Sequence, residues 1–274
     1  MAILAPQWLL FSAKAVLRPD YQAQWQSYAD TVAPYVDDIL GFYPVDEPLW
    51  YDATCHFSQE VRQVYELVNA TIKDRFPTKP IIVTFAYPCV TEELVIPAGY
   101  DWISFDRYGT FAPIPGYFDL IKRKMVSGQK ILLTADGFAS GGVPSERDQS
   151  GWALRARQYF NLAKGDAAVV GLWTFIWPSF SSGAGVRDMP LLRGEYQRIG
   201  AEVLGCPPPG EEDCCVRADC DDDDDATRDA CDVLAGRCVH TAIDAGADAG
   251  SGSSDAGGAT ADTGGAVTDA DSPE

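Results

Sequence analysis

The sequence lacks the marks of several large protein classes. It has no apolar run near the roughly 18 residues that a membrane helix needs, and no basic cluster to hold nucleic acid or anionic lipid. No G-x-G-x-x-G motif opens a helix after a strand, and no Walker motif occurs. There are two histidines and no G-x-S-x-G motif, so a Ser-His-Asp triad could form only through His56. We therefore predict no transmembrane segment and no nucleic-acid partner.

Positive charge is scarce, and the imbalance is local. The formal net charge is −19. From Gly205 onward there are 18 acidic and 3 basic residues, net −15, which leaves 22 acidic and 18 basic residues before it, net −4. The part before Gly205 is therefore a mildly acidic globular domain, and the hydrophobic fraction of 46% is ample for a core.

Cysteine is concentrated near the end of the chain. Six of the eight cysteines are Cys206, Cys214, Cys215, Cys220, Cys231 and Cys238. This density favours a disulfide-stapled module and an oxidising compartment, so we predict an extracellular or cell-surface location. A zinc site is the alternative, but C-x2-C pairs are absent and His240 stands alone. Cys55 and Cys89 follow neighbouring strands, where they form either a disulfide or two buried thiols.

Apolar strands alternate with helices before residue 204. The strands are expected at about 38–45, 80–87, 101–106, 130–136 and 168–176, and the helices at 20–37, 58–76, 117–127, 152–165 and 191–204. The strands are continuously apolar, as expected when helices cover both faces of a parallel sheet. In such α/β folds, function sits at the carboxyl ends of the strands.

The absence of nucleotide motifs favours a (β/α)8 TIM-type barrel over a doubly wound sheet. Only "AILAPQWLLF" could add one earlier strand, so the barrel lacks its first strands. The start "MAILAPQWLLF" also lacks a secretory signal. We expect it to lie inside a longer secreted protein, with the missing N-terminal part as a partner; a short, open sheet is the alternative. The predicted domains are the barrel at 1–204, a cysteine-rich module at 205–241 and a disordered Ala/Gly/Asp tail at 242–274.

Polar and aromatic side chains stand where the predicted strands end. They are Asp46 and Glu47, then Asp106 and Tyr108, then Asp136, then Trp173 and Trp177. Cleavage of a glycosidic bond needs one protonated and one ionised carboxyl group. Flat rings suit the C–H faces of sugars, and Tyr43, Trp50, Tyr51 and Trp102 add to them. Alternatively, these carboxylates are helix caps or solvated loop residues, and some of the tryptophans are core.

The order of four motifs resembles a clan-A glycoside hydrolase. "GFYPVDEP", "FDRYG", "TADGF" and "GLWTFIW" stand at the fourth, sixth, seventh and eighth strand positions of that barrel. The resemblance implies that Glu47 is the acid/base, that Asp46 replaces a sugar-binding Asn and that Asp136 replaces the nucleophile Glu. It implies Trp173 or Trp177 as the stacking platform. The shorter Asp136 implies either an inverting site, with carboxyls about 6.5–9.5 Å apart instead of about 5–5.5 Å, or lost catalysis.

The segment "CDDDDDATRDACDVLAGRCVHT" is similar to the cysteine-rich repeat of Dictyostelium-type extracellular proteins, which is frequent in myxobacterial surface proteins. Ala226 replaces one cysteine of that repeat, which leaves the disulfide pairing open. The run Asp221–Asp225 lacks the alternating D-x-D-x-D-G of calcium loops, which argues against a calcium site.

Together these patterns predict an exported hydrolase of oligo- or polysaccharides, with neither cofactor nor metal. Glu47 is expected to be the general acid and Asp136 the base or nucleophile. The expected substrate contacts are Tyr43, Asp46, Asp106, Tyr108, Trp173 and Trp177. A non-catalytic glycan-binding protein and a purely structural surface protein are the alternatives.

Overall fold

A computed structural model of the chain describes residues 2–13, 15–49, 55, 57–180, 183–205, 227–232 and 237–242. The chain divides into two units, Met1–Gly210 and Glu211–Glu274. Several predictions lie outside the described residues: those on Trp50, Tyr51, His56, Cys206, Cys214, Cys215, Cys220, Asp221–Asp225, Ala226 and the tail from residue 243.

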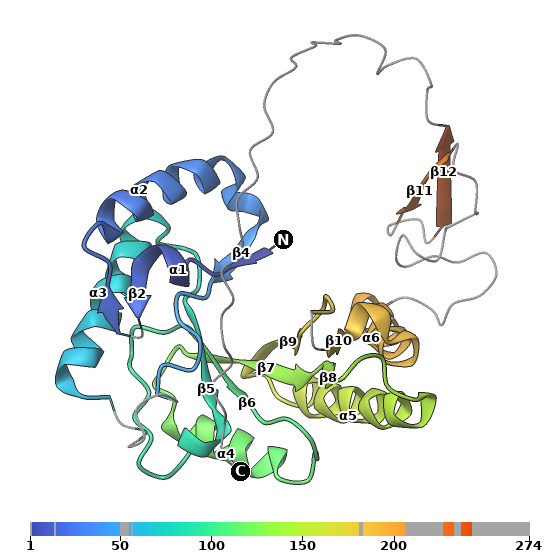
Figure 1. Ribbon diagram of the computed structural model, residues 1–274. Coiled ribbons are helices and arrows are strands. Elements are labelled where there is room, and N and C mark those ends of the chain that lie inside the picture. Colours follow the sequence, from blue (N-terminus) through green and yellow to red (C-terminus); the bar gives the residue numbers. More distant parts are fainter. Residues whose placement is uncertain are drawn as a thin grey trace, which may run out of the picture. The chain divides into compact units, whose positions relative to one another are not determined.

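The first unit alternates parallel strands with helices (Figure 1). Its main strands are β1 (Ala2–Leu4), β4 (Ile39–Phe42), β5 (Ile82–Ala86), β6 (Trp102–Asp106), β7 (Lys130–Asp136) and β9 (Val169–Phe175). Its helices are α1 (Gln7–Leu10), α2 (Tyr21–Val32), α3 (Gln59–Arg75), α4 (Ile114–Lys124), α5 (Glu146–Lys164) and α6 (Pro190–Leu204), with 3-10 turns at Ala33–Asp38, Tyr87–Cys89 and Val186–Asp188. Short antiparallel pairs join β2 (Phe11–Ala13) to β3 (Val16–Leu17) and β8 (Phe138–Ser140) to β10 (Gly183–Gly185).

The main strands follow one another in the order of the chain. β1 pairs with β4, and β5, β6, β7 and β9 form a second parallel group. Parallel bridges from Phe42 to Ile81 and from Asp46 to Thr84 link β4 to the β5 side. A reversal of the strand order is the mark of a doubly wound sheet. The described strands show no such reversal. The structure thus confirms an α/β fold with a parallel sheet, and the described strands do not close into a complete barrel.

The two faces of this sheet differ in chemistry. Side chains at alternate positions of a strand share a face. On β5, Val83 and Phe85 belong to the main core that the helices cover, together with Ile103, Phe105, Ile131, Leu133 and Ala135 of the next strands. The other face carries the buried polar residues Thr84, Ser104, Asp106, Thr134 and Asp136. The expectation of continuously apolar strands therefore holds for the helix-covered face, whereas the second face mixes the apolar Ile82 and Leu132 with the polar residues that bear the site.

Local signals explain where the helices begin. The Ser58 hydroxyl accepts a hydrogen bond from the Val61 N–H at the start of α3, as an N-cap does. Ser145 does the same for the Asp148 N–H at the start of α5. Glu60, Glu146 and Asp148 place negative charge in the first turns, where the helix dipole favours it.

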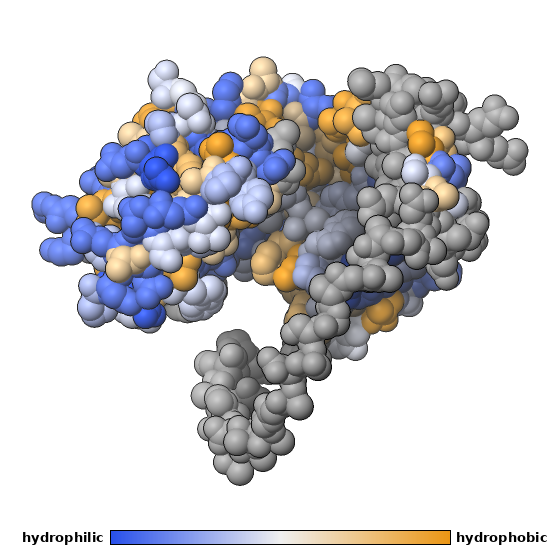
Figure 2. Space-filling view, turned by 90° about the horizontal axis from the view of Figure 1, so that it is seen from above, coloured by the Kyte–Doolittle hydropathy of each residue, from blue (hydrophilic) through white to orange (hydrophobic). Residues whose placement is uncertain are grey.

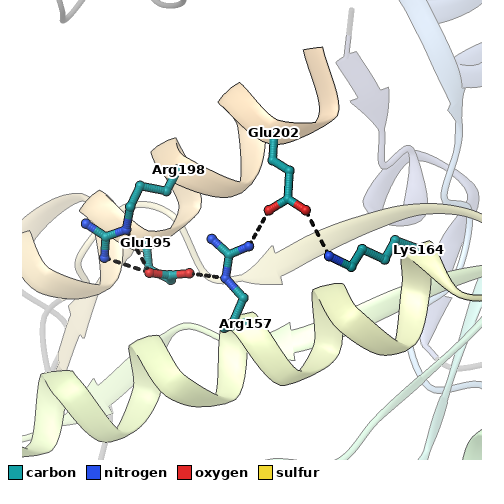
Figure 3. A network of polar contacts seen from close by, with 5 residues as sticks. All are labelled: Arg157, Lys164, Glu195, Arg198 and Glu202. Atoms are coloured by element: carbon teal, nitrogen blue, oxygen red, sulfur yellow. Dashed lines mark hydrogen bonds and ion pairs between the residues drawn. The ribbon is translucent and has the colours of Figure 1, made fainter. Parts of the chain in front are cut away.

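An ion-pair network fixes α6 against α5 (Figure 3). Glu195 is 8% exposed and accepts from Arg157 at 2.5 Å and from Arg198 at 2.6 Å. Glu202 joins Arg157 to Lys164 at 2.6 and 2.9 Å. Beneath it, Ala156 and Phe160 of α5 share an apolar cluster with Leu192 and Ile199 of α6.

On the face of the first unit that Figure 2 shows, hydrophilic residues surround smaller apolar patches. None of the helices in the described ranges is long and apolar enough to cross a membrane.

The described part of the second unit is a β-hairpin. β11 (Thr227–Asp232) pairs antiparallel with β12 (Arg237–Ala242), and Cys231 lies opposite Cys238 in the register. Cys238 is disulfide-bonded.

Candidate active site

A cavity of about 370 Å³ lies where the parallel strands end. It is lined by Tyr43, Asp46, Glu47, Thr84, Asp106, Tyr108, Thr134, Trp173, Thr174 and Phe175. Its volume is in the range of roughly 300–1,000 Å³ that ligand pockets occupy. Six of the eight residues expected at the site line this cavity: the carboxylates Asp46, Glu47 and Asp106 and the rings Tyr43, Tyr108 and Trp173.

Glu47 has an unusual backbone conformation at the mouth of this cavity. Its φ is +41°, in the left-handed region that residues with a side chain rarely adopt. Such strain persists where the surroundings hold it, often at functional sites. The backbone thus directs a half-buried carboxyl group into the cavity.

Asp106 is the carboxylate that lies against Glu47. It ends β6 and is 5% exposed. Burial raises the pKa of Asp106, and hydrogen bonds from Glu47 and Tyr108 act in the opposite direction. The Tyr108 hydroxyl donates to Asp106 at 2.8 Å. Two carboxyl groups can share a hydrogen bond only when one of them is protonated.

Asp46 belongs to a second carboxylate–tyrosine pair. The Tyr43 hydroxyl donates to Asp46, and the Asp46 N–H donates to Gln7 Oε1 at 3.2 Å. Burial and the Asp46 charge raise the pKa of Tyr43 well above its ordinary value, so its hydroxyl remains a donor. The Tyr43 ring lies edge-on to Trp173, with centroids 5.4 Å apart.

Trp173 is held by hydroxyl groups of the polar sheet face. Its indole N–H donates to the Thr134 hydroxyl, which is 2.5 Å from the Ser104 hydroxyl. These contacts fix the indole in the wall of the cavity. Trp177, the second tryptophan of the predicted platform, is 47% exposed and is not among the lining residues.

Asp136 is engaged elsewhere. It ends β7, is 5% exposed and is not among the residues that line the cavity. Arg155 of α5 donates to it at 2.9 Å from Nη2 and at 3.2 Å from Nε, and the Gly109 N–H donates at 3.3 Å. Burial raises the pKa of Asp136, while the charge of Arg155 lowers it. The two carboxylates that the resemblance implies as catalytic therefore have different surroundings.

A disulfide fastens the loop that follows Glu47. Cys55 is bonded to Cys89, with Cα atoms 5.0 Å apart, which confirms one of the two sequence-based alternatives. Cys89 is buried in the turn after β5, and its Sγ lies 3.7 Å from the Leu49 carbonyl oxygen. Cys55 is thus tied to the turn that follows β5.

Some site residues could not be anticipated. Arg155 lies in the middle of a helix and meets Asp136 only through folding. Thr84, Thr134 and Phe175 read as ordinary strand residues. Within the described ranges, no group of His, Cys, Asp or Glu side chains is arranged to hold a metal ion.

Comparisons with known proteins return only distant structural likenesses. No protein-family model and no curated protein matches the sequence. A beta-glucuronidase from Ruminococcus gnavus is 13% identical, with a TM-score of 0.47, over 62% of this chain and 31% of that one. A GH2 beta-galacturonidase from Eisenbergiella tayi bound to galacturonate is 14% identical, with a TM-score of 0.42, over 58% and 30%. The chain spans about a third of the length of these structures, and such low scores carry no argument about its activity.

Proposed function

We propose that the first unit is an exported, carbohydrate-active hydrolase that cleaves glycosidic bonds in the cavity at the strand ends. One observation carries the proposal: Asp46, Glu47 and Asp106 line the same cavity as four aromatic rings. Carboxyl groups supply the acid and the negative charge that glycoside cleavage requires. Aromatic rings suit the apolar faces of sugars.

In this mechanism Glu47 is the general acid. It gives its proton to the glycosidic oxygen as the bond to the anomeric carbon breaks. Positive charge then develops on that carbon and ring oxygen, where Asp106 and Asp46 stabilise it. A water molecule attacks the anomeric carbon and gives up its proton to Asp106, which completes the hydrolysis. In this proposal Glu47 carries the proton before substrate arrives and donates it in a hydrogen bond to Asp106. Glycosidase carboxyls stand about 5–9.5 Å apart, so substrate must enter between Glu47 and Asp106 and separate them.

Asp136 is proposed as a positioning residue. The resemblance implies a base or nucleophile there, but that role would require the ion pair with Arg155 to open. In its present contacts, Asp136 holds the Gly109 N–H just after Tyr108, the tyrosine that donates to Asp106. Asp136→Asn should therefore reduce activity less than Asp106→Asn, which removes a charge from the cavity itself.

The test is hydrolysis of aryl glycosides with leaving groups of different acidity. Glu47→Gln should lower kcat on 4-nitrophenyl and 4-methylumbelliferyl glycosides by about 10²–10⁴, the usual contribution of a general acid. The loss should be much smaller on 2,4-dinitrophenyl glycosides, because that leaving group needs no proton. Glu92→Gln is the matched control, since Glu92 is a surface carboxylate paired with Arg123. Equal losses on both substrate classes would remove Glu47 from this role.

The competing function is glycan binding without cleavage. The ion-paired state of Asp136 favours it, because the site then lacks the second carboxylate of the resembled family. Under this alternative the protein binds glycans but does not cleave them. Neither the wild-type protein nor Glu47→Gln then releases product from any substrate.

We further propose that the described strands are the third to eighth of a (β/α)8 barrel. Their sequential order supports this, as do the edge strands β1 and β9, each with one neighbour among the described strands. β9 leaves Val170 43% exposed, where a closing strand would pack. The Cys55–Cys89 bond and the disulfide of Cys238 support export to the cell surface or beyond.

A further inference from the structure

A second hollow lies on the other side of the aromatic rings that border the cavity. It has a volume of about 510 Å³ and lies between β8 and the first turns of α5. Its lining includes Phe138, Ser140, Arg147, Trp152 and Arg155. None of the roles proposed above uses Arg147 or Trp152.

Aromatic side chains from the linings of the two hollows contact one another. Tyr108 and Phe175 line the cavity, and Phe138 lines the second hollow. The Phe138 ring centroid is 5.1 Å from that of Tyr108 and 5.9 Å from that of Phe175. Phe175 is 46% exposed. Rings that line the cavity are therefore in contact with a ring that lines the second hollow.

The lining of the second hollow suits a sugar better than an anion. The positive charge of Arg155 is neutralised by its ion pair with Asp136. The lining also contains Asp148, whose negative charge balances that of Arg147. What remains is the half-buried indole of Trp152, which packs on one side against the apolar cluster of α5 and α6 and has the Arg155 guanidinium carbon 5.6 Å from its ring centroid. The Ser140 hydroxyl and the Arg147 guanidinium belong to the same lining. An aromatic ring with hydrogen-bonding groups at its edge is what a sugar needs, because its C–H face packs on the ring and its hydroxyls bind the polar groups.

The geometry points to a second sugar-binding site in this hollow, formed by Trp152 and Arg147, which holds a further unit of an uncharged oligosaccharide whose scissile bond lies in the cavity. This inference rests on the proposed function and makes its substrate an oligosaccharide or polysaccharide chain. Phe138 and Phe175 form the crossing between the two sites.

Binding as a function of chain length tests this site. The full chain carrying Glu47→Gln, which keeps ligands intact, is titrated with series from monosaccharide to hexasaccharide prepared from cellulose, xylan, chitin and pectin. Affinity should rise by about tenfold, or about 1.4 kcal/mol, once the oligosaccharide is long enough to fill both sites. Added Trp152→Ala or Arg147→Ala should remove that gain and leave monosaccharide affinity unchanged.

Leu154→Ala is the matched control, since Leu154 is on the same helix, 61% exposed and outside the hollow. It should keep the gain with length. Arg147 is exposed, so its truncation decides the matter even if Trp152→Ala misfolds. If affinity still rises with oligosaccharide length in both truncated variants, or does not rise with length at all, the second site is overturned and the proposed function is not. A gain confined to the acidic pectin series overturns the uncharged ligand. No binding to any glycan overturns the proposed function and this site with it.

Discussion

The ion pair between Asp136 and Arg155 offers the sharpest test of how the site is supported. The Asp136 side chain is 5% exposed and that of Arg155 is 19% exposed. Arg155→Met keeps most of the apolar stem and removes the charge, which leaves a buried carboxylate without its cation. Breaking a buried pair from one side costs roughly 3–5 kcal/mol. Because Arg155 is partly solvated, we expect about 3 kcal/mol.

The same pair predicts how this loss depends on pH. The folded-state pKa of Asp136 already lies above its usual value of 3.8 because of burial, and Arg155 holds it down. Removing Arg155 raises that pKa further. A carboxyl group whose pKa is raised in the folded state destabilises the fold at pH values above that pKa, where it is ionised. It has no such effect at pH values low enough for it to be protonated in both the folded and the unfolded state. The deficit of Arg155→Met should therefore be largest near neutral pH and shrink as pH falls toward the unfolded value.

Urea unfolding followed by the fluorescence of the seven tryptophans measures this. With a slope of about 2 kcal/mol per M, the midpoint should fall by about 1.5 M at pH 7 and by less at pH 4.5. Asp136→Asn combined with Arg155→Met should be more stable than Arg155→Met alone, because no charge is left unpaired. Arg147→Met, in the same helix but exposed, should change stability by less than about 0.5 kcal/mol. An Arg155→Met protein within that margin, or a deficit that grows on acidification, would refute the reasoning.

Three further predictions concern the frame of the site. The double variant Cys55→Ser, Cys89→Ser removes a cross-link between residues 34 positions apart. The free energy of unfolding should therefore fall by about 4 kcal/mol, because the unfolded chain regains loop entropy. A melting temperature equal to that of wild type would contradict this. Because φ is +41° at Glu47, Glu47→Gly should be more stable than Glu47→Ala by about 1 kcal/mol, and chemical denaturation showing the reverse would argue against strain there. A Cβ at Gly137 would lie 2.0 Å from Thr174 Oγ1 and 2.6 Å from Val186 Cγ2, so Gly137→Ala should cost about 1–3 kcal/mol or more; unchanged unfolding would mean that the strand ends move apart readily.

The strands were predictable because burial leaves a strong apolar signal. The expected segment 130–136 is β7 residue for residue, and 101–106 differs from β6 by one residue. The start of α5 was missed by six residues, although Ser145 and Asp148 form a capping pattern ahead of the first apolar residue. β8 and β10 were also missed, since strands of three residues, two of them glycine in β10, show no periodicity.

The site was predictable only in outline. The rule that parallel strand ends converge places Glu47 and Asp106 in one cavity. The rule does not say which way a strand-end carboxylate turns, and Asp136 turns to Arg155. That partner comes from a helix face, and no local pattern links an arginine to a carboxylate 19 positions earlier. Pairings that depend on tertiary packing leave no mark in the spacing of residues.

The most direct test of the central claim is the appearance of new reducing ends when the purified chain is incubated with soluble polysaccharides and aryl glycosides. The account predicts product from at least one substrate with wild type and Glu92→Gln, and a loss of about 10²–10⁴ with Glu47→Gln while that variant still binds the substrate. Glycan binding by wild type with no new reducing ends from any substrate would contradict a hydrolase and leave a glycan-binding protein.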